Sequence, residues 1–561
     1  MSNDDTTSRT PSEIDAVADA YVEKLAGLSP MTATALGVPG DDTRLDDFSP
    51  PGLDAVSALT ESTLAQLDGL TPRDAVDEVT LDAMTERLGL DKEIADRGYL
   101  LGELNVIESP LQSIRAIFDL MPSADVDDWQ NIAARMRDVP RAVHGYIESL
   151  DAGRRADRVA ARRQVAECIK QANQIGAGDG FFAGLAAGAD PTLPDTLRSE
   201  LSGAASDAGL AYRELASYLE SELSPVARES DAVGREEYAL WSRYFIGAEV
   251  DLDETYQWGL DELARITAEQ EEVARQIKPG AGVQEAMELL DADPARRLNS
   301  TAELQAWMQD LADTAVRELA GTHFDIPDPV RTIECKIAPT QDGGIYYTPP
   351  ADGFSRPGRM WWSVPEGVTQ FNAWRETTTV YHEGVPGHHL QCGQTVYRTE
   401  LLNKWRRLAC WVSGHGEGWA LYAERLMAEL GYLDDPADRM GMLDGQRLRA
   451  ARVVIDIGVH LGKPAPEEWG GGTWDADKAW PFLQANANMD DEFLRFELLR
   501  YLGWPGQATS YKVGQRLWEN IRDEARADAE RAGREFDIKA FHRRALDVGS
   551  VGLDTLRRAL S

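Results

Sequence analysis

The sequence has few cysteines and no long apolar run. Only four cysteines occur in 561 residues, which is too few for the disulfide framework of a small secreted protein. The opening residues MSNDDTTSRTPSE are polar and acidic, without the apolar core of a secretory signal, and no later run is long enough to cross a bilayer. We therefore expect a cytoplasmic protein with no membrane partner.

Positive charge is also scarce. Lys and Arg number 57 against 95 Asp and Glu, giving a net charge of −38, and the acidic residues are spread along the chain. A surface of this sign repels the phosphates of nucleic acids, so we expect no nucleic-acid partner. A hydrophobic content of 43% is enough to bury a large core. Composition leaves the oligomeric state open.

Helical periodicity dominates the chain, as in the first such segment, where apolar residues recur every three or four positions. Residues 329–365 differ, because β-branched and aromatic residues alternate there with Gly and Pro turns, which predicts two or three short strands. The sequence thus predicts a mostly α fold with a small β-sheet. We expect a disordered tail (1–12), a helical lobe (13–285) and a catalytic lobe (286–561), or one continuous domain.

The segment YHEGVPGHHLQ places His382, Glu383, His388 and His389 close together. The common helical zinc motif has histidines at i and i+4 with a Glu beside the first. Here the i+4 position is Pro386, which cannot bind a metal. On a regular helix His388 lies about 240° around the axis from His382, and His389 lies about 10 Å further along it. A straight helix would therefore bring neither to one ion.

The Pro386–Gly387 step predicts a kink or bulge, since proline removes a backbone donor and glycine permits unusual dihedral angles. Two residues absorbed there would return His388 to within one turn of His382. We therefore take His382 and His388 as ligands, with His389 facing the substrate or lying behind the ligands. In one alternative, His388 and His389 exchange these roles. In the other, the segment is a kinked core helix whose imidazoles are satisfied by hydrogen bonds.

Glu417, in GHGEGWALYAERL, is the candidate for the third ligand. In one class of zinc site, two histidines come from one helix and a glutamate from a later one, which leaves a position open for water. Glu424 lies two turns further on the same face, so only one of the two is expected to reach the ion. A solvated charge at a helix N-terminus is the alternative for Glu417. We predict one Zn²⁺ on His382, His388 and Glu417.

Five segments carry a resemblance to a known family: ATALGVPGDDTRLDDFSP, GGIYYTPPADGFSRPGRMWW, YHEGVPGHHLQ, GEGWALYAERL and SYKVGQ. From about residue 15 to the C-terminus the chain resembles the largely bacterial family of domain of unknown function 885, which is grouped with the thermolysin-like, gluzincin-type zinc metallopeptidases. The resemblance implies a large helical metallopeptidase-like fold with a deep cleft and the small sheet beside the zinc helix.

Substrate-binding candidates come from the predicted strands. In thermolysin-like sites an edge strand pairs with the extended substrate backbone, so Tyr346, Tyr347 and Arg356 are expected to contact substrate, as is His389. Arg356 would bind a carboxylate through two hydrogen bonds, or would only brace its loop.

Two residues are candidates for stabilising the oxyanion. His460 follows Asp456 by four residues, a spacing that orients an imidazole in a cleft or forms an ordinary buried pair. Tyr511, in SYKVGQ, is placed by the resemblance where a tyrosine hydroxyl donates to the oxyanion. Packing of Tyr511 in the core is its alternative.

Together these residues predict a zinc-dependent hydrolase, acting as a peptidase on short peptides or free termini, with Glu383 as the general base. A zinc amidase or esterase acting on a small metabolite is one alternative, since zinc chemistry does not itself select a peptide. A non-catalytic metal-binding protein is another, against which the intact Glu383 counts. The expected partner is a peptide or a small amide or ester.

Overall fold

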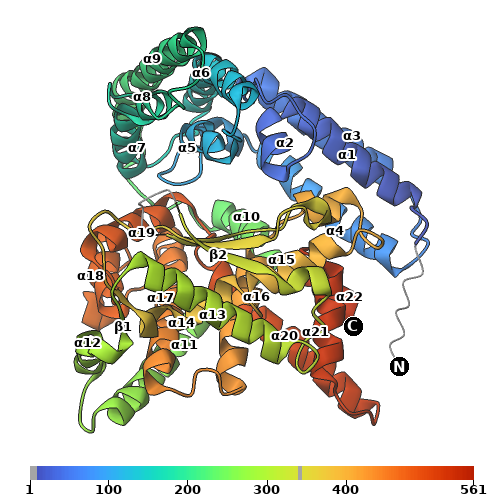
Figure 1. The fold of residues 1–561 in the computed structure, drawn as a ribbon, viewed down its shortest axis with the longest axis vertical. Coiled ribbons are helices and arrows are strands. Elements are labelled where there is room, and N and C mark those ends of the chain that lie inside the picture. The colour runs from blue at the N-terminus through green and yellow to red at the C-terminus, as the bar shows by residue number, and fades with distance from the viewer. Residues whose placement is uncertain (1–8, 339–343) are drawn as a thin grey trace.

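The computed structural model describes residues 9–338 and 344–561, and nearly all of its regular structure is helical. Strands are few and short, so the mostly α fold with small sheets is confirmed. Figure 1 shows the helices up to residue 218 as an upper layer above a larger body, which the rest of the chain forms.

The upper layer contains α1 (Glu13–Leu28), α2 (Pro30–Leu36), α3 (Pro50–Leu67), α4 (Ala75–Asp96), α5 (Pro110–Ala116), α6 (Val126–Arg155), α7 (Arg162–Ile175), α8 (Phe181–Ala187) and α9 (Asp195–Tyr218). The larger body contains α10 (Arg235–Ile246), α11 (Leu252–Ile277), α12 (Val283–Ala292), α13 (Thr301–Leu319), α14 (Ala373–Glu383), α15 (His388–Tyr397), α16 (Ser413–Glu429), α17 (Pro436–Leu461), α18 (Ala476–Asn486), α19 (Asp491–Gly503), α20 (Ser510–Arg531), α21 (Ile538–Val548) and α22 (Leu553–Leu560).

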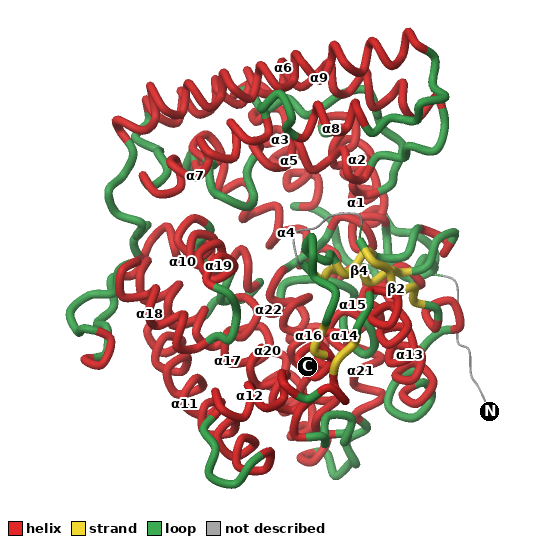
Figure 2. Tube along the Cα trace, turned by 60° about the vertical axis from the view of Figure 1, so that its left-hand side comes forward, coloured by secondary structure: helices red, strands yellow, loops and turns green. Residues whose placement is uncertain are grey.

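Two hydrophobic cores organise these helices. The smaller core joins α2 and α5–α9, in which the long helices α6 and α9 lie side by side (Figure 2). The larger core joins α1, α3 and α4 to α10–α22. The lobe boundary expected at residue 285 falls inside α12, and α10 and α11 before it already pack in the larger core. Along the chain, the larger core takes in α1, α3 and α4 and then α10–α22, with the helices of the smaller core between them.

The three strands of the main sheet lie within residues 329–365, where the sequence predicts strands. In the three-stranded sheet, β4 (Gly358–Trp362) is central, parallel to β2 (Ile333–Ile337) and antiparallel to β3 (Ile345–Thr348). One face of this sheet packs on α13. A second, two-stranded pair joins β1 (Arg297–Leu298) to β5 (Phe371–Asn372), directly before α14. The sheet therefore lies next to the segment that carries the histidines.

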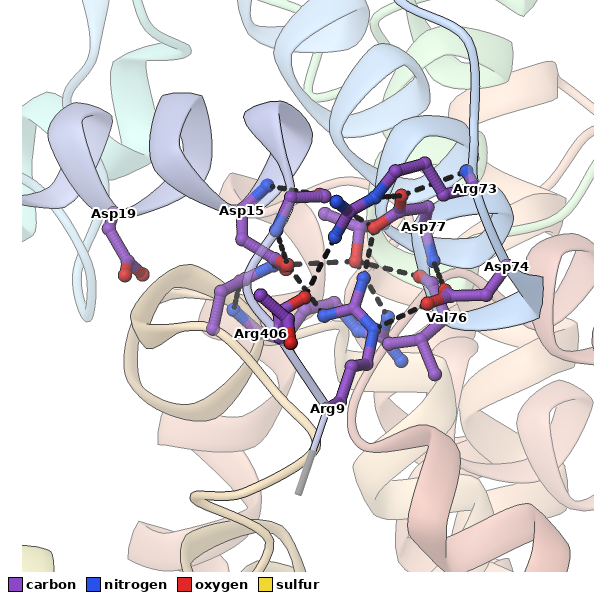
Figure 3. Close-up of polar contacts among 12 residues, drawn as sticks. Arg9, Asp15, Asp19, Arg73, Asp74, Val76, Asp77 and Arg406 are labelled. Carbon is purple, nitrogen blue, oxygen red and sulfur yellow. Dashed lines mark hydrogen bonds and ion pairs between the residues drawn. The ribbon is translucent and has the colours of Figure 1, made fainter. Parts of the chain in front are cut away.

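A cluster of ion pairs fixes the start of the chain (Figure 3). Of the tail expected over residues 1–12, residues 1–8 lie outside the described ranges. Arg9 pairs with Asp15 (2.5 Å), Asp74 (2.8 Å) and Asp77. Burial raises the pKa of Asp15, but hydrogen bonds from the Asn403 side chain and the backbone, with the charge of Arg9, outweigh it and lower that pKa. The first helix is thus bound both to α4 and to the larger body.

Replacing Arg9 by Ala should destabilise the protein by about 2 kcal/mol, because it leaves the fully buried Asp77 carboxylate with only the more distant Arg73 (3.9 Å) as a cation. The matched control is Arg97→Ala, which removes solvent-screened ion pairs to Glu93 and Glu236 and should cost clearly less stability. Urea unfolding followed by circular dichroism measures both changes. Equal shifts in the two variants would show that the Arg9 cluster does not hold the fold together.

Candidate metal centre

The kink expected at Pro386 is a complete break between two helices. Helix α14 ends at Glu383 and α15 begins at His388. Between them the chain folds back on α14, as the N–H of Gly384 donates to the carbonyl of Val380 (2.9 Å) and that of Gly387 to the carbonyl of Tyr381 (3.0 Å). The Val385–Pro386 peptide is cis.

Gly387 is the tightest point of this turn. A Cβ atom there would lie 1.8 Å from the carbonyl oxygen of His382, so only glycine fits without moving the backbone. The indole N–H of Trp419 on α16 donates to the carbonyl of Pro386 (2.9 Å) and holds the turn from the other side. As a result the His382 and His388 rings lie with centroids 4.9 Å apart and planes perpendicular.

The turn brings both imidazoles to Glu417. Its Oε2 lies 3.4 Å from Nε2 of His382 and 3.6 Å from Nε2 of His388, and the three candidate ligand atoms all lie within 4.8 Å of one another. Zinc bonds of about 2.1 Å at tetrahedral angles separate two ligand atoms by about 3.4 Å. These N···O distances are long for hydrogen bonds but match ligands that share one ion. The donor set therefore fits zinc.

Glu417 reaches this point because α16 and α20 pack unusually closely. A Cβ on Gly418 would lie 2.4 Å from the backbone of Gly514. Gly418 and Gly514 therefore let the helix backbones touch directly beside the candidate ligand Glu417. The close packing accounts for glycine at positions where a helix former would otherwise be favoured.

A second carboxylate supports the first histidine from behind. Nδ1 of His382 donates to Oε1 of Glu424 (2.7 Å), whose Oε2 accepts from Gln446 (3.1 Å). Lys512 in turn donates to Gln446 (2.5 Å) and pairs with Glu262 (2.9 Å). Such a contact fixes the imidazole with Nε2 free to bind an ion. The spacing of Glu424 from Glu417 puts it on the right face, but nothing in the sequence points to this role.

The electrostatics of the site favour a cation. Glu383, Glu417 and Glu424 surround two imidazoles in a buried environment. Burial opposes charge on His382, yet the Glu417 and Glu424 carboxylates outweigh it and raise the pKa of His382 to about 10. Burial likewise opposes charge on Glu417, and the two histidines lower its pKa well below the usual range. Three carboxylates gathered here are suited to a divalent ion.

A cavity of about 870 Å³ opens at Glu417. Its walls come from both layers, including Tyr21 of α1 and Asp91 of α4 above, and Trp241 of α10 below. Trp411 also lines it; this side chain is 52% exposed, and its ring centroid lies 6.2 Å from that of His388. No sequence pattern singles out Trp411, because its position follows from the turn before α16.

His389 faces the sheet and not Glu417. It is fully buried, with Nδ1 at 2.9 Å from the hydroxyl of Tyr347 and Nε2 at 2.8 Å from the carbonyl of Val330. Burial lowers the pKa of His389 to about 4. Both ring nitrogens are thus engaged, and of the two adjacent histidines it is His388 that lies with His382 and Glu417 in the candidate metal-binding group.

The remaining substrate-binding candidates lie on the sheet and its loop. Tyr346 is 38% exposed and stacks on Trp361, with centroids 6.3 Å apart. Arg356 donates to the carbonyls of Pro349 (2.9 Å) and Pro357 (3.2 Å), and so braces its own loop. Neither side chain is among the described residues that line the cavity at Glu417.

His460 and Tyr511 belong to separate groups of contacts. His460 is buried, donates to the carbonyl of Tyr501 (2.9 Å) and lies 3.6 Å from Asp456. Burial lowers the pKa of His460 to about 4 and raises that of Asp456 to about 8. The Tyr511 hydroxyl accepts from Arg500 (3.3 Å). Within the described ranges, the ligand cluster consists of His382, His388 and Glu417 without either residue.

Comparisons with known proteins identify the family and the fold. A family model described as a bacterial protein of unknown function, DUF885, matches residues 30–560. No curated protein matches. None of the described helices has both the length and the apolar character that a membrane span requires.

Two solved structures share the fold over almost the whole chain. One, titled a putative lipoprotein from Colwellia psychrerythraea, has 23% identity and a TM-score of 0.82, with 98% of each chain covered. Another, titled a putative lipoprotein of unknown function from Shewanella oneidensis, has 17% identity and a TM-score of 0.73, with 98% of this chain and 99% of the other covered. At these identities the likeness shows the fold alone.

His388→Gln should weaken zinc binding by at least about 100-fold, since loss of even a supporting residue costs about 10–100-fold. The matched control is the neighbouring substitution His389→Gln, which should keep zinc affinity within about threefold, since His389 faces the sheet. Competition with a chromogenic chelator measures both affinities. Loss of zinc from His389→Gln but not from His388→Gln would reverse the ligand assignment.

Gly387→Ala should cost about 3 kcal/mol of stability or separate the two histidines and weaken zinc binding, because its methyl group collides with the His382 carbonyl. Gly27→Ala in α1 is the control, as its Cβ meets nothing within 4 Å. Thermal unfolding and zinc titration of both variants provide the measurement. If Gly387→Ala retained both stability and zinc affinity, the close approach at Gly387 would not be what brings His382 and His388 together.

Proposed function

We propose that this chain, which belongs to the DUF885 family of bacterial proteins of unknown function, is a zinc-dependent hydrolase that acts as a peptidase on short peptides or free peptide termini. The observation that carries the proposal is the position of two imidazole nitrogens 3.4 and 3.6 Å from one carboxylate oxygen, beside a further buried carboxylate at Glu383.

His382, His388 and Glu417 would hold the ion, and Glu424 would keep the first imidazole in the tautomer that binds it. Zinc in such a site polarises a water molecule and the carbonyl of the substrate. Glu383 directly follows a ligand at the end of α14, so its carboxylate can take the proton of the attacking water. The same carboxyl group then returns the proton to the nitrogen of the leaving amine.

The cavity supports small or extended substrates. Its volume of about 870 Å³ lies within the range of about 300–1,000 Å³ common for sites that enclose a small ligand. Because its walls come from both helical layers, a folded protein could not bring an internal loop to Glu417, whereas a short peptide or a free terminus could enter. Trp411 and Ser413 line the cavity together with Glu417 and would contact a substrate bound there.

Glu383→Gln should retain one zinc ion per chain and lower peptide turnover by about 10²–10⁴-fold, because the amide cannot accept the proton of water. Glu429→Gln, an exposed substitution at the end of α16, is the control and should leave turnover unchanged. Mass-spectrometric cleavage of a peptide library by zinc-loaded protein, with and without a chelator, gives the activity. Wild-type turnover in Glu383→Gln would refute its role as base, and a zinc-loaded wild type that cleaves no peptide would refute the peptidase.

A further inference from the structure

Acidic side chains outnumber basic ones among the described residues that line the cavity at Glu417. Six carboxyl groups line it, contributed by α4, α10, α16 and the connections between helices of the upper layer. Only two cationic side chains occur among its described lining residues. The carboxyl groups belong to Asp91, Glu103, Glu108, Asp157, Glu237 and Glu417, and the cations to Arg158 and Arg228.

The two arginines are engaged with other groups. Arg228 donates to the backbone carbonyls of Val159 (2.8 Å) and Ala232 (3.0 Å). The guanidinium carbon of Arg158 lies 4.7 Å from the centre of the Tyr99 ring. Both arginines oppose the rise that burial causes in the pKa of Glu237, and the six carboxyl groups still outnumber the two cations.

Two of the carboxyl groups lie where burial opposes their charge. Burial, with the negative charge of Glu108, raises the pKa of Glu103 to about 7. Burial also raises the pKa of Asp91 to about 6, helped by Glu86 and opposed by Arg87. Buried carboxylates without sufficient positive charge cost free energy, and a cationic ligand would offset that cost.

Aromatic rings line the same cavity and provide a second, independent feature. Their faces carry negative quadrupole charge and attract ammonium and guanidinium groups, as the contact of Arg158 with Tyr99 already illustrates. The 52% exposed Trp411 extends this lining to the ring of His388. The rings are those of Tyr21, Tyr99, Trp241, Tyr244, Phe245, Trp411 and Trp504.

From this combination we infer that the cavity selects substrates that carry a protonated amine or a guanidinium group. Asp91, Glu103 and the aromatic faces would bind the cation, while the bond to be cleaved lies at the Glu417 end of the same cavity. This inference rests on the proposed hydrolase, because it names the substrate class for that site. The cation could be the N-terminal ammonium of a peptide or a lysine or arginine side chain.

Four peptides of one length test the inference, with lysine or the uncharged norleucine at one position and with a free or an acetylated N-terminus. We expect kcat/KM to rise by at least about 10-fold when a positive charge is present at one of the two places. The acetylated pair reports the side chain, and the norleucine pair reports the N-terminal ammonium. Values within about twofold across all four peptides would overturn the inference and leave the peptidase standing.

Variants and a binding measurement separate this inference from the proposed function. Glu103→Gln and Asp91→Asn should each lower the ratio of charged to uncharged peptide by at least about fivefold. The control Glu220→Gln, at an exposed site directly after α9, should keep it. Calorimetric binding of the four peptides to Glu383→Gln should follow the same charge order, whether or not the wild type cleaves them. Failure of the zinc-loaded wild type to cleave any peptide would refute the peptidase alone. An unchanged ratio in both cavity variants, or equal binding of all four peptides, would refute cation selection.

Discussion

The close approach of Gly387 to the carbonyl of His382 is the constraint on which the site depends. An unbroken helix would point the two imidazoles in different directions, and a larger residue at position 387 would force the turn open. With glycine there, α15 starts anew beside the end of α14, and two residues six positions apart present Nε2 atoms to one carboxylate. Trp419 joins this turn to α16, so the helix that supplies Glu417 also holds the histidines in place.

Around that turn the protein accumulates negative charge where burial makes it costly. The Glu417 and Glu424 carboxylates and the acidic wall of the cavity all lie within or against the helical packing. Fold stability alone does not call for so many buried carboxylates, since apolar residues of similar volume would pack at least as well. A metal ion bound at the site, and then a cationic group of the substrate, would offset the cost of burying these carboxylates.

Local patterns in the sequence predict the features that the backbone decides locally. Helical periodicity, the strand-forming stretch at 329–365 and the break at Pro386–Gly387 each follow from a few neighbouring residues. His388 can be preferred to His389 as a candidate ligand because a turn that absorbs two residues returns His388 to within one helical turn of His382. Positions set by packing between distant segments are different. The bond from Glu424 to His382, the place of Trp411 and the cavity depend on how α14, α16 and the upper layer meet. The spacing of Asp456 and His460 shows that they share a helix face. It does not show that the His460 imidazole donates to the carbonyl of Tyr501.

Anomalous diffraction at the zinc absorption edge, from crystals of the protein grown with zinc, tests the central claim most directly. The account predicts one strong peak at about 2.1 Å from Nε2 of His382, Nε2 of His388 and a carboxylate oxygen of Glu417, with Nδ1 of His382 still bonded to Glu424. A peak at other side chains, or fully zinc-loaded crystals without a peak between these three residues, would contradict it.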